Sequence, residues 1–215
     1  MKKSVAVLGL GQYGKSLAEN LYRMGADVLV ADQNEDLINE FADKCTSAVC
    51  ANLTEESEVV SLGLKNMDIV VTAMGNNLAA TIMSVTVAKE QGVPLVIAKT
   101  SSRRMSSILK KVGADKILNP EGEGGERSAK ILFSNYFKDY FRVDNNLYMI
   151  EMTPHEDWIG KNLAELEIRK KEKIIVVAVK EKGQWQMVET KRPFQADDTL
   201  LIMAGNQRME TVLQR

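Results

Sequence analysis

The amino-acid sequence predicts an α/β fold: a doubly wound parallel sheet followed by a smaller α+β module. Three observations support this prediction. Strand-like and helix-like segments alternate up to about residue 118, which is typical of βαβ units with right-handed crossovers. The strand-like segments are apolar on both faces, as a sheet covered on both sides requires. Beyond Asn145 and Asn146 short strands predominate and the regular alternation is lost.

Each element of the first part has its own signal in the sequence. Six short apolar runs are the expected strands: Val5–Leu8, Val28–Ala31, Ala48–Cys50, Ile69–Thr72, Leu95–Ala98 and Lys116–Leu118. Five segments between them are the expected helices: Lys15–Met24, Glu35–Ala42, Glu55–Leu62, Leu78–Gln91 and Arg103–Val112. Asn34, Thr54 and Asn77 precede helices, as N-caps do. Four glycines follow helices, where a left-handed C-terminal cap is favoured: Gly25, Gly63, Gly92 and Gly113.

The glycine motif between the first strand and the first helix is the most specific local signal. Gly9, Gly11 and Gly14 form G-x-G-x-x-G in V-A-V-L-G-L-G-Q-Y-G, and Asp32 ends the next strand 18 residues later. The first glycine permits a tight turn, the second lets backbone approach a phosphate, and the third lets the helix pack closely. The helix N-terminus attracts an anion, and the acid can bind a ribose diol. This pattern indicates a Rossmann-like, dinucleotide-binding domain.

A second nucleotide-binding pattern overlaps the first. Gly9, Gly14, Lys15 and Ser16 also satisfy the P-loop pattern G-x-x-x-x-G-K-[ST]. The middle glycine and the position of Asp32 are features that only the dinucleotide motif requires. We therefore favour the Rossmann-type interpretation over the P-loop.

The end of the first domain is expected to be helical. Glu121–Glu126 is acidic, rich in glycine and expected to be flexible, and Arg127–Val143 has the pattern of one long helix. Four aromatic residues would share a face of that helix: Phe133, Phe137, Tyr140 and Phe141. They could pack on their own domain, but the sheet is already flanked by five helices, so we favour a contact between subunits. The predicted domains are residues 1–143, ending in this dimerisation helix, and 144–215.

The second domain is expected to be a small α+β module. Strands are predicted at Leu147–Met152, Ile174–Lys180, Gln184–Val188 and Leu200–Met203, and helices at Ile159–Leu166 and Gln207–Leu213. Lys182-Gly183 is a plausible hairpin turn. A module of roughly 70 residues is near the lower size limit for independent stability, so it is expected to need a partner copy.

Composition and charge exclude several classes of protein. The formal net charge is −1 and the charges are evenly spread, so nothing recruits nucleic acid. Cys45 and Cys50 lack the companions of a zinc site and are expected to be reduced, partly buried thiols. The N-terminus does not follow the pattern of a signal peptide. The uncharged run Ile69–Ala88 is interrupted by Gly75 and is too polar for a membrane span.

The sequence lacks the groups that a dehydrogenase would need. His155 is the single histidine, and its place in a loop favours solvent exposure over catalysis. No Tyr-x-x-x-Lys occurs in the first domain, and G-x-S-x-G and H-E-x-x-H are absent. A nucleotide-binding domain without catalytic groups is most simply a sensor. Two alternatives stay open, a small NAD(P)-dependent oxidoreductase and a redox-sensing transcription regulator, although no helix-turn-helix is evident.

Several segments carry a resemblance to a known family. They include V-A-V-L-G-L-G-Q-Y-G-K-S-L-A, V-L-V-A-D-Q-N-E, A-N-L-T-E-E-S, S-L-G-L-K-N-M-D and K-K-V-G-A-D-K-I-L-N-P-E, together with the C-terminal module. The chain resembles the RCK family, regulators of K⁺ conductance, and in particular the subunits of Ktr/Trk potassium uptake systems. The resemblance implies an RCK-N domain, an RCK-C domain and no enzymatic activity. It also implies dimers, an octameric ring and a membrane channel subunit that the ring gates from the cytoplasmic side.

The resemblance also implies ligands. The ring would differ between its complexes with ATP or NADH and its complexes with ADP or NAD⁺, and this difference would gate the pore. The residues implied to bind the nucleotide are Gly9, Gly11, Gln12, Tyr13, Gly14, Asp32, Asn52 and Lys99. Many relatives have arginine where Gln12 stands, so selectivity for ATP is in doubt. Glu121 matches an acid associated with Mg²⁺ or Ca²⁺, although it could simply complement a helix dipole. Cyclic di-AMP could bind the RCK-C domain through Arg169, which could equally lie in a solvated basic turn.

Overall fold

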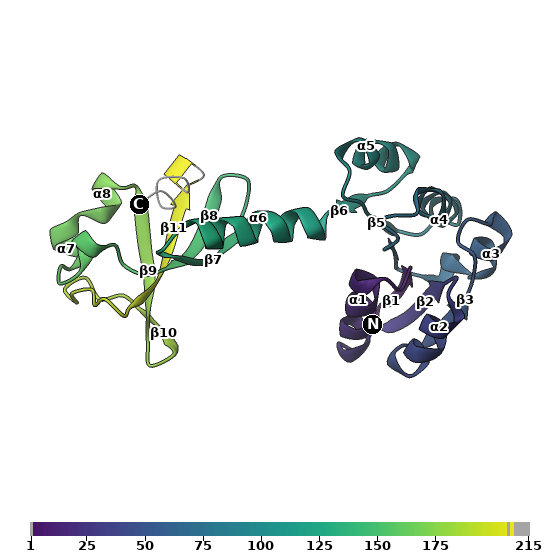
Figure 1. The fold of residues 1–215 in the computed structure, drawn as a ribbon, viewed down its shortest axis with the longest axis horizontal. Coiled ribbons are helices and arrows are strands. Elements are labelled where there is room, and N and C mark those ends of the chain that lie inside the picture. Colours follow the sequence, from purple (N-terminus) through teal and green to yellow (C-terminus); the bar gives the residue numbers. More distant parts are fainter. Residues whose placement is uncertain (1, 206, 209–215) are drawn as a thin grey trace. The chain divides into compact units, whose positions relative to one another are not determined.

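The structure, a computed structural model, describes residues 2–205 and 207–208. It contains two compact units, one ending at Gly122 and the other beginning at Glu123 (Figure 1). The division lies within helix α6, Pro120–Phe133. The sequence-based boundary at residue 143 falls about twenty residues after this division. The two units are described in turn.

The first unit is built on six parallel strands. The strands are β1 Ser4–Leu8, β2 Asp27–Asp32, β3 Ser47–Cys50, β4 Ile69–Thr72, β5 Leu95–Lys99 and β6 Lys116–Leu118. The helices between them are α1 Gln12–Arg23, α2 Glu35–Phe41, α3 Glu56–Ser61, α4 Leu78–Glu90 and α5 Arg103–Val112. The sheet order is β3-β2-β1-β4-β5-β6, which is the doubly wound order with its switch point between β1 and β4. The predicted Rossmann-like fold is confirmed.

Side chains of the central strands alternate between two apolar layers. Val5 and Val7 point to the face that α1 and α2 cover, where Phe41 is fully buried. Ala6 and Leu8 point to the opposite face, which α3, α4 and α5 cover. Figure 1 shows the two groups of helices on either side of the strands. Both faces are buried, which explains why successive residues in the middle of these strands are apolar.

Most of the predicted helix ends are observed. Each of the four predicted C-cap glycines has a positive φ: Gly25, Gly63, Gly92 and Gly113. Asn34 accepts hydrogen bonds from Asp36 N and Leu37 N, and Asn77 accepts one from Ala80 N. Thr54 is not a cap, since α3 begins one residue later than expected, after Glu55.

The predicted long helix Arg127–Val143 is wrong. Helix α6 runs from Pro120 to Phe133 and includes the acidic glycine-rich segment that was expected to be flexible. The chain then turns and forms strand β7, Phe137–Arg142. Phe137 is only 4% exposed and packs in the core of the second unit. The common aromatic face therefore does not exist, and Phe137 is no interface residue.

Pairing with the next strand explains this correction. Aromatic residues favour strands, and β7 pairs antiparallel with β8, Leu147–Met152. Phe137 and Tyr140 then reach the buried side of the sheet, where Tyr140 packs against Tyr148. Arg127 on α6 forms an ion pair with Asp139 on β7, so the helix and the strand are tied together.

The second unit is an antiparallel sheet with small helices. Its strands are β7, β8, β9 Ile174–Glu181, β10 Gln184–Met187 and β11 Thr199–Gly205, in the order β10-β9-β11-β8-β7. Helices α7 Leu163–Leu166 and α8 Ile168–Lys171 are shorter than the helix predicted at Ile159–Leu166. The turn at Lys182 and Gly183 has positive φ at both residues, as predicted. Most of the helix predicted at Gln207–Leu213 lies outside the described residues.

The buried polar side chains of the second unit include His155 and Asp198. His155 is 4% exposed and lies against Tyr136 and Trp158, so its predicted solvent exposure is wrong. Arg192 forms a bidentate pair with Asp198, with both distances at 2.7 Å, and a further bond to Glu181. Burial alone would raise the pKa of Asp198, but its hydrogen bonds to Arg192 and Gln195 N outweigh this and lower it.

Candidate functional site

The glycine loop joins β1 to α1, and its three glycines differ in their surroundings. Gly9 has a φ of +100°, and a Cβ there would lie 2.5 Å from Met74 Cγ. A Cβ on Gly14 would overlap the carbonyl oxygen of Gly9. A Cβ on Gly11 would meet nothing within 4 Å. Gly9 and Gly14 are therefore required by the fold, whereas Gly11 faces open space.

Helix α1 begins directly after this loop. Gly11 is its N-cap and provides no side-chain hydrogen bond, and the first turn contains no acidic residue. Gln12 is exposed at the start of the helix. The first N–H groups of a helix have no partner within it and favour an anion. This end of α1 is suited to a phosphate group.

Asp32 ends β2 and holds the loop in place. Its Oδ2 accepts a hydrogen bond of 2.7 Å from Leu10 N, and its Oδ1 accepts one of 3.0 Å from Asn34 N. Each oxygen retains a lone pair for a further donor. The carboxylate can therefore bind a ribose hydroxyl while it fixes the glycine loop, a second role that the sequence did not reveal.

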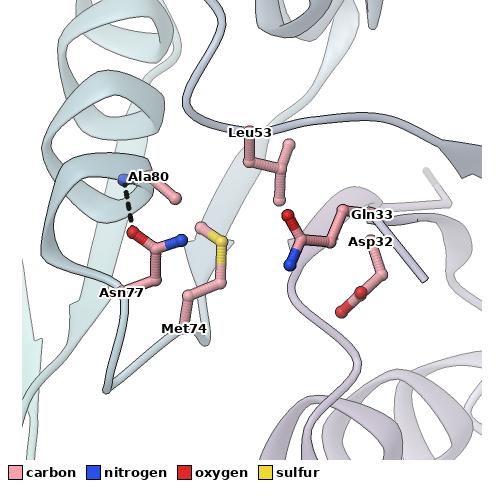
Figure 2. A pocket seen from close by; sticks show the side chains of 6 residues that line it. All are labelled: Asp32, Gln33, Leu53, Met74, Asn77 and Ala80. Carbon is pink, nitrogen blue, oxygen red and sulfur yellow. Dashed lines mark hydrogen bonds between the residues drawn. The ribbon is translucent and has the colours of Figure 1, made fainter.

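Two adjoining cavities lie at the carboxyl ends of the strands. The smaller, of about 100 Å³, is lined by Asp32, Gln33, Leu53, Met74, Asn77 and Ala80 (Figure 2). The larger, of about 380 Å³, is lined by Gly9, Gly11, Gln12, Tyr13, Asp32, Ala73, Met74, Gly75, Asn76, Asn77, Lys99 and Glu121. In Figure 2, Leu53 and Met74 face the same space as the Gln33 amide. A slot of mixed polarity, in which Leu53 and Met74 supply apolar surface for a base, leads past Asp32 to the glycine loop. This arrangement matches the order of base, ribose and phosphate in a nucleotide.

Six of the eight predicted nucleotide-binding residues line the larger cavity: Gly9, Gly11, Gln12, Tyr13, Asp32 and Lys99. Gly14, which packs against Gly9, lines neither cavity. Asn52 lies outside both cavity linings. Its Oδ1 accepts hydrogen bonds from Thr54 N and Thr54 Oγ1, and its backbone N donates to Glu58. Its neighbour Leu53 reaches the smaller cavity instead. Asn52 therefore shapes the loop beside the slot, and its contact with a base stays a prediction.

Lys99, at the end of β5, supplies positive charge to the larger cavity. Its Nζ lies 2.5 Å from Glu121 Oε1 and 5.6 Å from the ring centroid of Tyr13. The Lys99 side chain is 12% exposed, whereas that of Glu121 is 58% exposed. Hydrogen bonding from Lys99 lowers the pKa of the Glu121 carboxyl below its usual value. The pair gives this end of the site one fixed cation and one accessible anion.

Lys15 distinguishes the two nucleotide-binding patterns. Its Nζ pairs with Glu40 on α2 at 2.8 Å, and Lys15 is not among the residues that line the cavities. A P-loop lysine would reach the phosphates. Together with the strand order, this placement supports the Rossmann-type interpretation.

The cysteines differ in accessibility. Cys45 is buried, and burial raises the pKa of its thiol. Cys50 is exposed and pairs in register with Asp32, and its Sγ lies 3.6 Å from the carbonyl oxygen of Gln33. Within residues 2–205 and 207–208, His, Cys, Asp and Glu form no group of three or more that could hold a metal ion. Among the described residues, no helix is both long and apolar enough to cross a bilayer.

Comparison with known proteins places the chain in a family. Residues 5–120 match the TrkA-N domain and residues 147–215 the TrkA-C domain. The chain is 31% identical to Ktr system potassium uptake protein A of Bacillus subtilis (strain 168) over 96% of this chain and 93% of that protein. The chain belongs to the RCK family, Ktr/Trk type. Ktr system potassium uptake protein C of the same organism is 36% identical over 84% of the chain and 81% of its own length.

The fold of this Ktr/Trk-type chain also occurs in a solved channel. The structure described as the GsuK channel bound to NAD superposes with a TM-score of 0.67 at 14% identity, over 99% of the chain. The chain spans only 39% of the length of that structure. At this identity the comparison shows a common fold. The resemblance predicted from the sequence is confirmed by the domain matches and by the potassium uptake proteins.

Proposed function

We propose that the chain is a nucleotide-sensing regulatory subunit of a potassium uptake system. The main supporting observation is a pair of adjoining cavities in a chain of the Ktr/Trk type, which together bring Leu53 and Met74, Asp32 and the glycine loop into one site. In this proposal the chain does not transport ions itself. It acts on a membrane potassium channel or transporter subunit from the inner face of the cell membrane.

The ligand proposed for the two cavities is an adenine nucleotide, ATP, ADP or NAD(H). Leu53 and Met74 would pack against the base, and Asp32 would accept hydrogen bonds from the ribose. Phosphates would lie at Gly11 and the start of α1, within reach of Lys99. Gln12 can donate hydrogen bonds there but brings no charge, so the site offers a third phosphate less stabilisation than arginine would.

We further propose that the chain is not an enzyme. The described residues that line the two cavities include carboxylates, amides and one lysine, but no histidine or cysteine that could transfer a proton near neutral pH. Binding and release of nucleotide would then be the signal. Turnover of NADH in the presence of the purified chain would contradict this part of the proposal.

Three further parts of the proposal concern assembly and additional ligands. Subunits would form dimers and then a ring, for which an octamer is the expected size. Glu121, exposed at the rim of the site, would be the residue that meets Mg²⁺ or Ca²⁺. The second unit, with the basic run that contains Arg169, would be the place for cyclic di-AMP.

The experiment that tests the function has two stages. Native mass spectrometry of the purified chain identifies the nucleotide that it retains, and calorimetry compares ATP, ADP, NAD⁺ and NADH. Potassium uptake is then measured in cells that carry the chain with its transporter subunit, with and without the Asp32→Ala substitution. Nucleotide binding and uptake that both depend on Asp32 support the proposal. Potassium uptake that is the same with and without the chain would contradict the proposal.

A further inference from the structure

Asn77 lies where the two cavities adjoin. Three of the described residues line both cavities: Asp32, Met74 and Asn77. The backbone holds Asn77 in place, because its N–H donates to Met74 O at 3.1 Å and its carbonyl oxygen accepts from Thr81 N at 3.0 Å. The Met74 thioether is only a weak acceptor. Asp32 and Asn77 are therefore the two side chains of this junction that can form strong hydrogen bonds to a ligand.

The cap of α4 determines which end of the Asn77 amide faces the cavities. Its Oδ1 accepts a hydrogen bond of 3.1 Å from Ala80 N, which the amide nitrogen could not do. The nitrogen Nδ2 therefore points away from the helix, and Figure 2 shows it directed toward the space that Asp32 and Gln33 face from the end of β2. Among the described residues, none accepts a hydrogen bond from this nitrogen. The junction thus combines a carboxylate that accepts with an amide nitrogen that donates.

We propose that Asn77 is a further nucleotide-binding residue, whose Nδ2 donates to the same ribose hydroxyl that donates to Asp32. The inference rests on the proposed nucleotide-binding function and deepens it. A hydroxyl has one proton and two lone pairs, so it can donate to the carboxylate and accept from the amide at the same time. A deoxyribose without that hydroxyl would leave both groups covered and unpaired, and a site of this kind rejects such an analogue. Asp32 and Asn77 together select ribonucleotides.

The test removes the donor and keeps the cap. Aspartate and serine cap helices about as well as asparagine, so Asn77→Asp and Asn77→Ser should fold, and thermal melting checks this. Neither variant has an amide nitrogen, and the serine variant adds no charge. ADP, 2′-deoxy-ADP and 3′-deoxy-ADP are titrated by calorimetry into both variants and the wild-type chain. The matched control is Asn162→Asp, because Asn162 caps α7 in the same way and lies outside both cavity linings.

We expect both Asn77 variants to bind ADP about twofold to tenfold more weakly, the contribution of one hydrogen bond. The deoxynucleotide that lacks the shared hydroxyl should bind the variants and the wild-type chain equally, and Asn162→Asp should bind all three ligands like the wild type. Unchanged ADP affinity in both Asn77 variants overturns the inference. So does an equal loss for all three nucleotides, which would place the amide against a phosphate or the base, and so does a loss confined to Asn77→Asp, which would reflect the added charge. If the wild-type chain binds none of the three, the nucleotide-binding function itself has failed.

Discussion

Asp32 shows how one side chain can serve both the fold and the ligand. Its carboxylate accepts hydrogen bonds from Leu10 N and Asn34 N and still faces both cavities. The sequence predicted the ligand role from the position of an acid after the second strand. The structural role was not predictable, since it depends on the path of the glycine loop in space.

We expect Asp32→Ala to weaken nucleotide binding by about 1.5–3 kcal/mol, the contribution of a hydrogen bond to a charged group. Calorimetry with the nucleotide that co-purifies measures the loss. Asp36→Ala is the matched control, because Asp36 lies on α2 outside the cavity linings and should bind like the wild type. Unchanged affinity of Asp32→Ala would show that Asp32 is not a ligand.

The glycines of the loop should separate stability from binding. Gly14→Ala places a methyl group on the carbonyl oxygen of Gly9, so we expect a loss of about 3 kcal/mol in the free energy of unfolding. Gly11→Ala meets no protein atom and has an ordinary φ of −64°, so the fold should be intact. Its methyl group would instead exclude a phosphate. Denaturant unfolding and nucleotide titration of both variants check the contrast, and equal destabilisation would contradict it.

At the level of elements, the sequence predicted the first unit well. Its strands and helices match the expected ranges within a few residues, because each helix has a clear end such as Gly25 or Gly113. The segment after α6 was wrong for a physical reason. Phe137, Tyr140 and Phe141 have spacings that suit a helix, but the same aromatic run also suits a strand, and pairing with β8 decides between them.

The same limit applies to the candidate site. The glycine motif and Asp32 lie within one βαβ unit, so their spacing along the sequence identifies them. Leu53, Met74 and Asn77 follow other strands and carry no motif. They reach the slot only because the strand order places β3, β2, β1 and β4 side by side.

The Arg192 cluster should stabilise the second unit in a pH-dependent way. The Asp198 side chain is 6% exposed, so Asp198→Asn, which breaks the pair with Arg192, should cost about 3 kcal/mol of unfolding free energy. Because folding lowers the pKa of Asp198, its stabilisation is fully present above the unfolded-state value of about 3.9 and is lost as pH falls through the folded value. Unfolding measured between pH 7 and pH 2 should show a constant difference between the two proteins above about pH 4 and a difference that shrinks below it. A difference that did not shrink below about pH 4 would contradict the assignment.

For the whole molecule, the replacement of the predicted long helix by α6 and β7 changes which residue we expect to control the association of subunits. Phe137 is buried in the second unit, so Phe137→Asp should unfold that unit and leave assembly untested. Phe133, at the end of α6, is 73% exposed, and its neighbour Leu132 is 85% exposed. We expect Phe133→Asp to give a smaller species that is still folded, because the charge opposes burial in a subunit contact and not the packing within one chain. Light scattering measures the mass, and a wild-type mass would place the interface elsewhere.

The different surroundings of the two thiols have a practical consequence for studying this protein. A maleimide dye should attach to Cys50 and spare Cys45, since one thiol is exposed and the other is buried with a raised pKa. The dye would then stand beside Gln33, at the rim of the smaller cavity. Its emission should change when a nucleotide enters, so the native chain offers a fluorescent readout of occupancy without any added cysteine. If the emission of the attached dye did not change with any nucleotide, this result would argue against a base bound in that cavity.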